Sequence, residues 1–190
     1  KSYEKILIIL ANIPKIKRLA FGTSRSSDVN LSSIKNINPE GEFNKQNFLA
    51  AVAACKVLGV SKDDIEKALK NFKLPKGRLD YVYDSLFKVV IDFAHTPNAF
   101  EQVLSYLRKK VKGRIIHVFS CAGERDKTKR PQMGKISSDF ANIIVLTSED
   151  PRRESIKKIN GEILSGIKNP VTQILQIPDR QKAIDRAIAM

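Results

Sequence analysis

Three polar stretches, each placed directly after an apolar run, hold most of the residues in this sequence that could bind a small molecule. They are residues 92–98, 120–134 and 147–153. In an alternating α/β sheet, neighbouring parallel strands end at one edge, and ligands bind outside that edge. For residues 120–134 alone, a solvated surface loop is the plainer interpretation. Three such strand ends together favour a binding site.

The first stretch carries groups suited to a sugar or a base. A carboxylate at a strand end, here Asp92, accepts hydrogen bonds from ribose hydroxyls in dinucleotide-binding folds. His95 can stack or hydrogen-bond without a fixed charge near neutral pH. The sequence has no GxxxxGK[ST] loop, so a phosphate cradle of that kind must come from elsewhere.

The second and third stretches combine cations with carboxylates. Arginine binds carboxylate or phosphate through two parallel hydrogen bonds, a role open to Arg125, Arg130 and Arg152. Glu149 and Asp150 could receive an ammonium group. Arginines and carboxylates that face one pocket would suit an amino acid, because an amino acid carries both charges.

These stretches also resemble one known family. Residues 92–100, 123–134 and 147–152 read DFAHTPNAF, GERDKTKRPQMG and TSEDPR. The Mur ligase family has a pattern close to DYAHTPD, then GDRDxxKRPxMG, then DNPR, and the middle pattern is long and specific. Residues 41–51, GEFNKQNFLAA, resemble the GxFNxxNxLAA of that family's central domain. The resemblance covers residues 43–190.

The resemblance implies an ATP-dependent amide ligase that uses Mg²⁺ and acts on a UDP-muramoyl dipeptide and a diamino acid. By resemblance, the residues that contact ATP would be Asn47, Arg78 (in GRLD), Asp92 and His95. The residues that hold the amino acid would be Arg125, Glu149, Asp150, Pro151 and Arg152. No catalytic residue or metal ligand is implied within this sequence. The phosphate-binding loop and the UDP-sugar domain of the family are absent from it, so we expect the chain alone to be inactive.

The amino acid to be added depends on a few positions. An arginine at the position of Arg152 resembles family members that take meso-diaminopimelate, whose distal carboxylate needs a cation, and this favours meso-diaminopimelate over L-lysine. Glu149 and Asp150 stand where Asp-Asn is usual, which adds a negative charge near that carboxylate. Phe93 likewise replaces Tyr. The alternatives are a ligase resembling folylpolyglutamate or cyanophycin synthetases, and a non-catalytic basic binding module.

Alternating strands and helices are expected to position these residues. Apolar runs predict strands at residues 5–11, 86–93, 114–119, 142–147 and 171–177. Helical spacing and capping residues predict helices at residues 44–58, 61–72, 97–108, 132–140, 155–167 and 178–190. This alternation predicts an α/β fold with a parallel sheet covered on both faces.

The domain organisation follows from a change of sequence pattern near residue 77, where helical segments give way to alternating strands and helices. Residues 1–76 are expected to be an incomplete helical end of the family's central ATP-binding domain. Residues 77–190 are expected to be its Rossmann-like, mostly parallel C-terminal domain, truncated at its end. The chain stops after a predicted helix without a terminating signal, so we expect it to be a fragment.

Composition narrows the class further. The 190 residues include 34 Lys and Arg against 20 Asp and Glu, a formal charge of +14, which favours anionic partners. We do not expect nucleic acid among them, because the basic residues are dispersed and no nucleic-acid-binding motif is present. Two cysteines give no disulfide framework and fit a reducing cytoplasm. No apolar run approaches the ~20 residues that span a bilayer. We expect a monomer.

Overall fold

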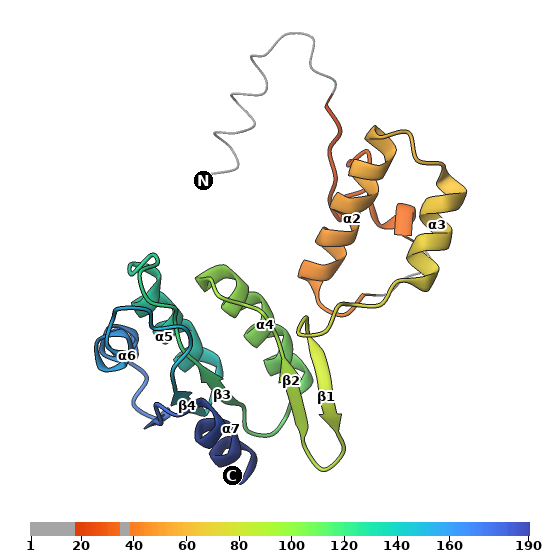
Figure 1. The fold of residues 1–190 in the computed structure, drawn as a ribbon. Coiled ribbons are helices and arrows are strands. Elements are labelled where there is room, and N and C mark those ends of the chain that lie inside the picture. The colour runs from red at the N-terminus through yellow and green to blue at the C-terminus, as the bar shows by residue number, and fades with distance from the viewer. Residues whose placement is uncertain (1–17, 35–38) are drawn as a thin grey trace. The chain divides into compact units, whose positions relative to one another are not determined.

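The chain divides between Lys73 and Leu74 into two units, which are considered separately here (Figure 1). The computed structural model describes residues 18–34 and 39–190. The strand expected at residues 5–11 lies outside the described residues. The assignment of residues 1–76 to a central ATP-binding domain stays a prediction.

The first unit is a helical hairpin, as the capping residues predict. It contains the short helix η1 (Leu31–Ile34), α2 (Glu42–Val57) and α3 (Lys62–Asn71). Gly59 has a positive φ of 77° in the turn between α2 and α3, where glycine carries no Cβ penalty. The Ser61 side chain accepts a hydrogen bond from the amide of Asp64 and caps α3.

The core of this unit lies on one face of α2. It consists of Val29, Phe48, Leu49, Val52, Ala53 and Ile65. Val57 and Leu58, the last two residues of the helix expected at residues 44–58, do not join this core: both are exposed, because α2 ends at Val57 and the chain turns away.

The second unit opens with an antiparallel hairpin. Strand β1 (Asp80–Asp84) pairs with β2 (Lys88–Ile91), and the register shifts between Tyr81 and Tyr83. The sequence did not predict β1, and it placed residues 86–93 in the parallel sheet. That placement is wrong. The apolar run pairs instead with its immediate neighbour in sequence, and an apolar run of this length does not itself specify its pairing partner.

The parallel sheet is formed by the other three described strands of this unit. They are β3 (Ile116–Phe119), β4 (Ile143–Leu146) and β5 (Gln173–Gln176), in the order β3-β4-β5. All four β4 residues are buried, as expected for a strand covered on both faces. The prediction of a parallel sheet is therefore confirmed for these strands.

Four helices cover the two faces of this sheet. They are α4 (Pro97–Lys110), α5 (Lys129–Phe140), α6 (Ile156–Leu164) and α7 (Arg180–Ile188). Ile144 and Leu146 of β4 pack in one cluster with residues of α4, α5 and α6. Ile143 and Val145 pack on the opposite face in a cluster with Ala183 of α7. The alternation follows from the two-residue period of a strand.

Helix α5 packs closely against α6 and fixes the end of the 120–134 stretch. A Cβ on Gly134 would lie 2.1 Å from the carbonyl oxygen of Ile163, so only glycine fits this crossing. The helix begins at Lys129, three residues before the expected start. Lys129 and Arg130 therefore belong to a helix rather than to a loop. None of the described helices is long and apolar enough to span a membrane.

Candidate functional site

The loops that follow β3 and β4 meet at the carboxyl edge of the parallel sheet. The amide of Gly123 donates a hydrogen bond of 2.8 Å to the carbonyl oxygen of Asp150. A Cβ on Gly123 would lie 1.9 Å from the carbonyl oxygen of Pro151. Two of the three polar stretches therefore adjoin, and the absence of a side chain at Gly123 allows them to do so.

The first polar stretch reaches the second through a lysine. Lys129 at the start of α5 donates a hydrogen bond of 2.8 Å from Nζ to the carbonyl oxygen of His95. The strand before His95 belongs to the hairpin and not to the parallel sheet. The three stretches are thus brought together, although the first arrives from a different sheet than expected.

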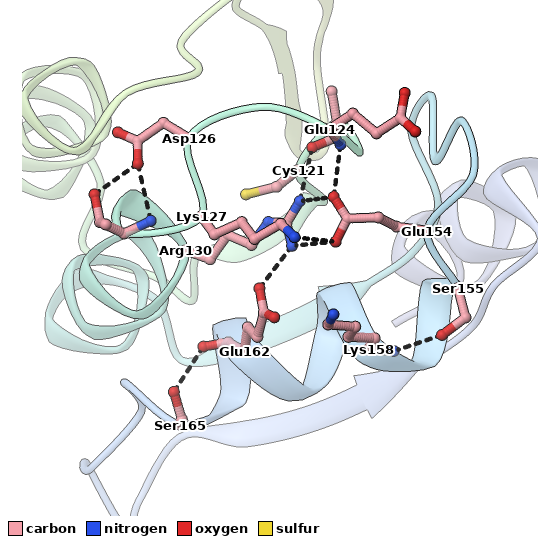
Figure 2. Close-up of polar contacts among 12 residues, drawn as sticks. Cys121, Glu124, Asp126, Lys127, Arg130, Glu154, Ser155, Lys158, Glu162 and Ser165 are labelled. Carbon is pink, nitrogen blue, oxygen red and sulfur yellow. Dashed lines mark hydrogen bonds and ion pairs between the residues drawn. The ribbon is translucent and has the colours of Figure 1, made fainter.

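Arg130 is fully buried and does not face a substrate. Its Nη1 and Nη2 donate to the two carboxylate oxygens of Glu154, each at 3.0 Å (Figure 2). Nη1 also donates to Glu162 at 2.6 Å, and Nη2 to the carbonyl oxygen of Ala122 at 3.1 Å. The sequence left Arg130 open as a substrate ligand. The structure contradicts that role, because the buried charge is balanced by two internal carboxylates.

The electrostatics of this pair follow from its hydrogen bonds. The hydrogen bonds from Arg130, followed by that from the amide of Glu124, lower the pKa of Glu154 to about 2. The hydrogen bond to Glu154 is the largest of the contacts that raise the pKa of Arg130. Both groups are charged at neutral pH. Glu154 was not identified from the sequence, since a glutamate beyond the DNPR-like stretch carries no distinguishing signal.

Arg125 and Arg152 lie on the two joined loops. Arg125 is exposed and has no hydrogen-bond or ion-pair partner among the described residues. Arg152 Nε lies 3.4 Å from a carboxylate oxygen of Asp150. Glu149, on the same loop as Arg152, is also exposed. Two guanidiniums and two carboxylates on adjoining loops form a set that can bind a zwitterion.

The backbone of both loops takes a left-handed turn beside these arginines. Glu124, immediately before Arg125, has a φ of 52°, and Arg152 itself has a φ of 50°. Non-glycine residues adopt this region only where neighbouring contacts hold them. The adjacent Asp126 accepts hydrogen bonds from the hydroxyl and amide of Thr128, and these lower its pKa. The loop is therefore ordered by its own side chains.

Three of the four residues expected to contact the nucleotide, Arg78, Asp92 and His95, form a second cluster. The Arg78 guanidinium lies 4.4 Å from the centroid of the Phe93 ring, and the His95 ring lies 5.1 Å from the same ring, edge to face. Phe93 is 59% exposed. The sequence noted Phe93 only as a departure from the family pattern. Its place between two polar groups makes it part of the candidate site.

Asp92 supports the backbone of this cluster. Its Oδ2 accepts a hydrogen bond of 2.8 Å from the amide of Leu79, and its Oδ1 accepts one of 2.7 Å from the amide of Ala94. Each carboxylate oxygen can accept a further bond, so contact with a ribose remains open. Asn47 belongs to the first unit, where it is exposed on α2.

The chemistry of these groups fits a nucleotide better than a metal ion. An exposed aromatic ring flanked by a guanidinium and an imidazole offers stacking and cationic contacts to a base or a phosphate. In residues 18–34 and 39–190, no cluster of three or more His, Cys, Asp or Glu side chains could hold a metal ion.

Comparison with known protein families shows to which family the chain belongs. The family described as "Mur ligase, glutamate ligase domain" matches residues 77–190. The chain belongs to the Mur ligase family. Its membership covers the parallel sheet, the hairpin and both clusters described above.

Individual relatives match a longer part of the chain than the family does, and those described here are named as diaminopimelate ligases. The UDP-N-acetylmuramoyl-L-alanyl-D-glutamate–2,6-diaminopimelate ligase of Aquifex aeolicus is 44% identical over 150 residues, which are 79% of this chain and 31% of the relative. A ligase of the same name from Wigglesworthia glossinidia brevipalpis is 39% identical over 170 residues, 88% of this chain and 34% of the relative. The chain thus spans about a third of the length of the curated relatives it matches.

Solved structures of Mur-type ligases share the fold. One structure of a UDP-N-acetylmuramoyl-L-alanyl-D-glutamate–2,6-diaminopimelate ligase has a TM-score of 0.56 and 34% identity, covering 78% of this chain and 30% of that one. Mycobacterium tuberculosis folylpolyglutamate synthase, complexed with ADP and AMPPCP, has a TM-score of 0.63 at 20% identity, covering 86% and 35%. The second likeness concerns the fold alone.

Proposed function

We propose that this chain is part of an ATP-dependent ligase that adds a diamino acid to UDP-N-acetylmuramoyl-L-Ala-D-Glu during peptidoglycan synthesis. The observation that carries the proposal is the joining of the Arg125 loop to the Arg152 loop by the bond from Gly123 to Asp150. This junction places two arginines and two acidic residues on adjoining loops of a Mur ligase domain. The names of the relatives at 39–44% identity support the same substrate class.

We propose that the incoming amino acid binds at this junction. Arg125 and Arg152 bind its carboxylates, and Glu149 and Asp150 receive an ammonium group. Pro151 shapes the turn between them, since its carbonyl oxygen lies against Gly123. The diamino acid is meso-diaminopimelate rather than L-lysine, because Arg152 offers a cation to the distal carboxylate that lysine lacks.

We propose further that the Arg78, Asp92 and His95 cluster contacts ATP, with Asn47 contacting the adenine. ATP supplies the phosphoryl group that activates the acceptor carboxylate. Arg78 and His95 orient the nucleotide against the Phe93 ring, and Asp92 holds the backbone beneath them. Mg²⁺ would be held largely by residues outside this chain. The chain alone would be inactive, and the full-length protein would work as a cytoplasmic monomer.

The test is release of ADP by the full-length protein that carries this chain. ADP should be formed only when UDP-N-acetylmuramoyl-L-Ala-D-Glu and the amino acid are both present, and faster with meso-diaminopimelate than with L-lysine. The 190-residue chain alone should form none. If the full-length protein released no ADP with either amino acid, the proposed function would be wrong.

A further inference from the structure

Glu154 lies outside the three stretches that the sequence singled out, yet its side chain contacts the Arg125 loop at several points. It accepts both hydrogen bonds from Arg130 and a third, of 2.6 Å, from the amide of Glu124 (Figure 2). The ammonium of Lys127 lies 3.6 Å away. All these donors belong to residues 124–130. One carboxylate therefore holds this loop and the start of α5.

The contacts of Glu154 complete a two-point junction between the loops. The amide of Gly123 bonds to the carbonyl oxygen of Asp150, and the amide of Glu124 bonds to Glu154. The first bond precedes Arg152 in the sequence and the second follows it, while Arg125 comes directly after Glu124. The amides of Gly123 and Glu124, which are consecutive on the Arg125 loop, thus bond to residues that flank Arg152 on both sides.

Arg130 makes this junction rigid. Its guanidinium is fully buried and its Nε has no hydrogen-bond partner among the described residues, so the charge depends on Glu154 and Glu162. A buried charge that loses one partner is strongly destabilised, which keeps Glu154 in place. Bidentate pairing also restricts the orientation of the Glu154 carboxylate.

We propose that Glu154, held by Arg130, is a positioning residue that sets the spacing of Arg125 and Arg152 for the amino acid substrate. This inference rests on the proposed function. Glu154 itself does not touch the substrate. Its carboxylate accepts from the amide of Glu124, and its own amide donates a hydrogen bond of 2.9 Å to the carbonyl oxygen of Pro151, which closes the turn that contains Arg152. Glu154 therefore contacts the loops at both left-handed residues, Glu124 and Arg152, so that both guanidiniums are in place before the amino acid binds.

Glu162 provides a matched control. It is also a carboxylate bonded to Arg130, at 2.6 Å, but it lies on α6 and no described contact joins it to the loop backbone. Replacing either residue by glutamine removes one charge beside Arg130. Both carboxylate oxygens of Glu154 accept hydrogen bonds, so the amide nitrogen of Gln in Glu154→Gln must face a donor of Arg130 or Glu124. In Glu162→Gln the amide oxygen can still accept the single bond from Arg130. The two variants separate loss of positioning from loss of charge balance.

The experiment compares Glu154→Gln and Glu162→Gln in the full-length protein. Glu154→Gln should raise KM for meso-diaminopimelate by about tenfold or more, with KM for ATP changed by less than about twofold. Glu162→Gln should leave both KM values within about twofold. If the two variants changed KM for meso-diaminopimelate equally, or if Glu154→Gln left it unchanged, the positioning role would be overturned.

Amide hydrogen exchange gives a second measurement that does not depend on ligase activity. In Glu154→Gln the peptides containing Gly123 and Glu124 should exchange about tenfold faster than in the unaltered protein, and in Glu162→Gln they should not. Equal exchange in both variants would overturn the positioning role. An unaltered protein that released no ADP would instead overturn the proposed function, so the two failures are distinguishable.

Discussion

Gly123 and Pro151 approach so closely that a methyl group on the glycine would lie 1.9 Å from the proline carbonyl oxygen. This approach brings the loop after β3 against the loop after β4. The neighbouring bond from the Gly123 amide to Asp150 depends on it. Glycine is required here by contact rather than by its backbone angle, because the neighbour is main chain and cannot rotate away.

Substitution of Gly123 by alanine should therefore open the junction. We expect Gly123→Ala to lower stability by about 1–3 kcal/mol, the range for an overpacked site, and to raise KM for the amino acid by about tenfold. Thermal unfolding and steady-state kinetics measure the two effects. Gly113→Ala is the control, since a Cβ there meets nothing within 4 Å. Unchanged kinetics in a folded Gly123→Ala protein would contradict the role of the junction.

The pairing of Asp150 with Arg152 predicts an effect on amino acid preference. Asp150→Asn removes the carboxylate that lies 3.4 Å from Arg152 Nε, which frees the guanidinium for a substrate carboxylate. The ratio of kcat/KM for meso-diaminopimelate over L-lysine should rise about twofold to fivefold, since exposed pairs contribute roughly 1 kcal/mol or less.

A distant ion pair serves as the control for that measurement. Asp139→Asn removes the exposed partner of Lys135 on α5, at 2.6 Å, without touching either loop. It should leave the ratio unchanged. A loss of ammonium binding at Asp150 would lower kcat/KM for both amino acids, because both carry ammonium groups. A ratio that fell in Asp150→Asn would therefore contradict the release of Arg152 for the distal carboxylate.

Local signals in the sequence predicted the elements well. Thr96 caps α4 with Pro97 in its first turn, and Ser155 caps α6, each accepting a hydrogen bond from an amide three residues on. Such caps depend on neighbours in sequence. The parallel strands β3, β4 and β5 were also predicted, because their apolar runs alternate with helices.

Partners distant in sequence could not be predicted in the same way. The run that contains β2 pairs with β1, and nothing in its apolar composition distinguishes that pairing from a place in the larger sheet. Arg130 resembled the substrate-binding arginines by type, and only its burial against Glu154 and Glu162 separates them. Those contacts span 24 and 32 residues, beyond any local pattern.

The packing of α5 against α6 predicts opposite effects at two glycines. Gly134→Ala would bring a Cβ within 2.1 Å of the Ile163 carbonyl oxygen, and should destabilise the protein by about 1–3 kcal/mol. Gly161→Ala lies inside α6 with nothing within 4 Å, and should stabilise it by about 0.5–1 kcal/mol through helix propensity. Chemical denaturation measures both. A destabilised Gly161→Ala protein would contradict the open surface of α6.

His117 should make stability depend on pH. Its ring stacks on Phe119 at 4.6 Å, meets the edge of Phe100 at 4.9 Å, and its Nδ1 lies 2.8 Å from the Ser137 hydroxyl. Burial lowers the pKa of His117 from 6.5 to about 4. Between about pH 4 and pH 6.5 His117 is protonated in the unfolded chain and neutral in the folded protein. Protonation therefore favours the unfolded chain in this range. Stability contributed by His117 is present above pH 6.5 and is lost as the pH falls toward 4.

The measurement is the free energy of unfolding at several pH values in the unaltered protein and in His117→Phe. From pH 6.5 down to about 4 the unaltered protein should lose up to about 3 kcal/mol more than the variant. Above pH 6.5 the difference between the two proteins should be constant, because neither state then gains a proton at this site. The comparison cancels the surface carboxylates, which titrate in both proteins. Parallel pH profiles throughout would show that the imidazole is as readily protonated in the folded state as in the unfolded one, which is incompatible with its position between Phe100 and Phe119.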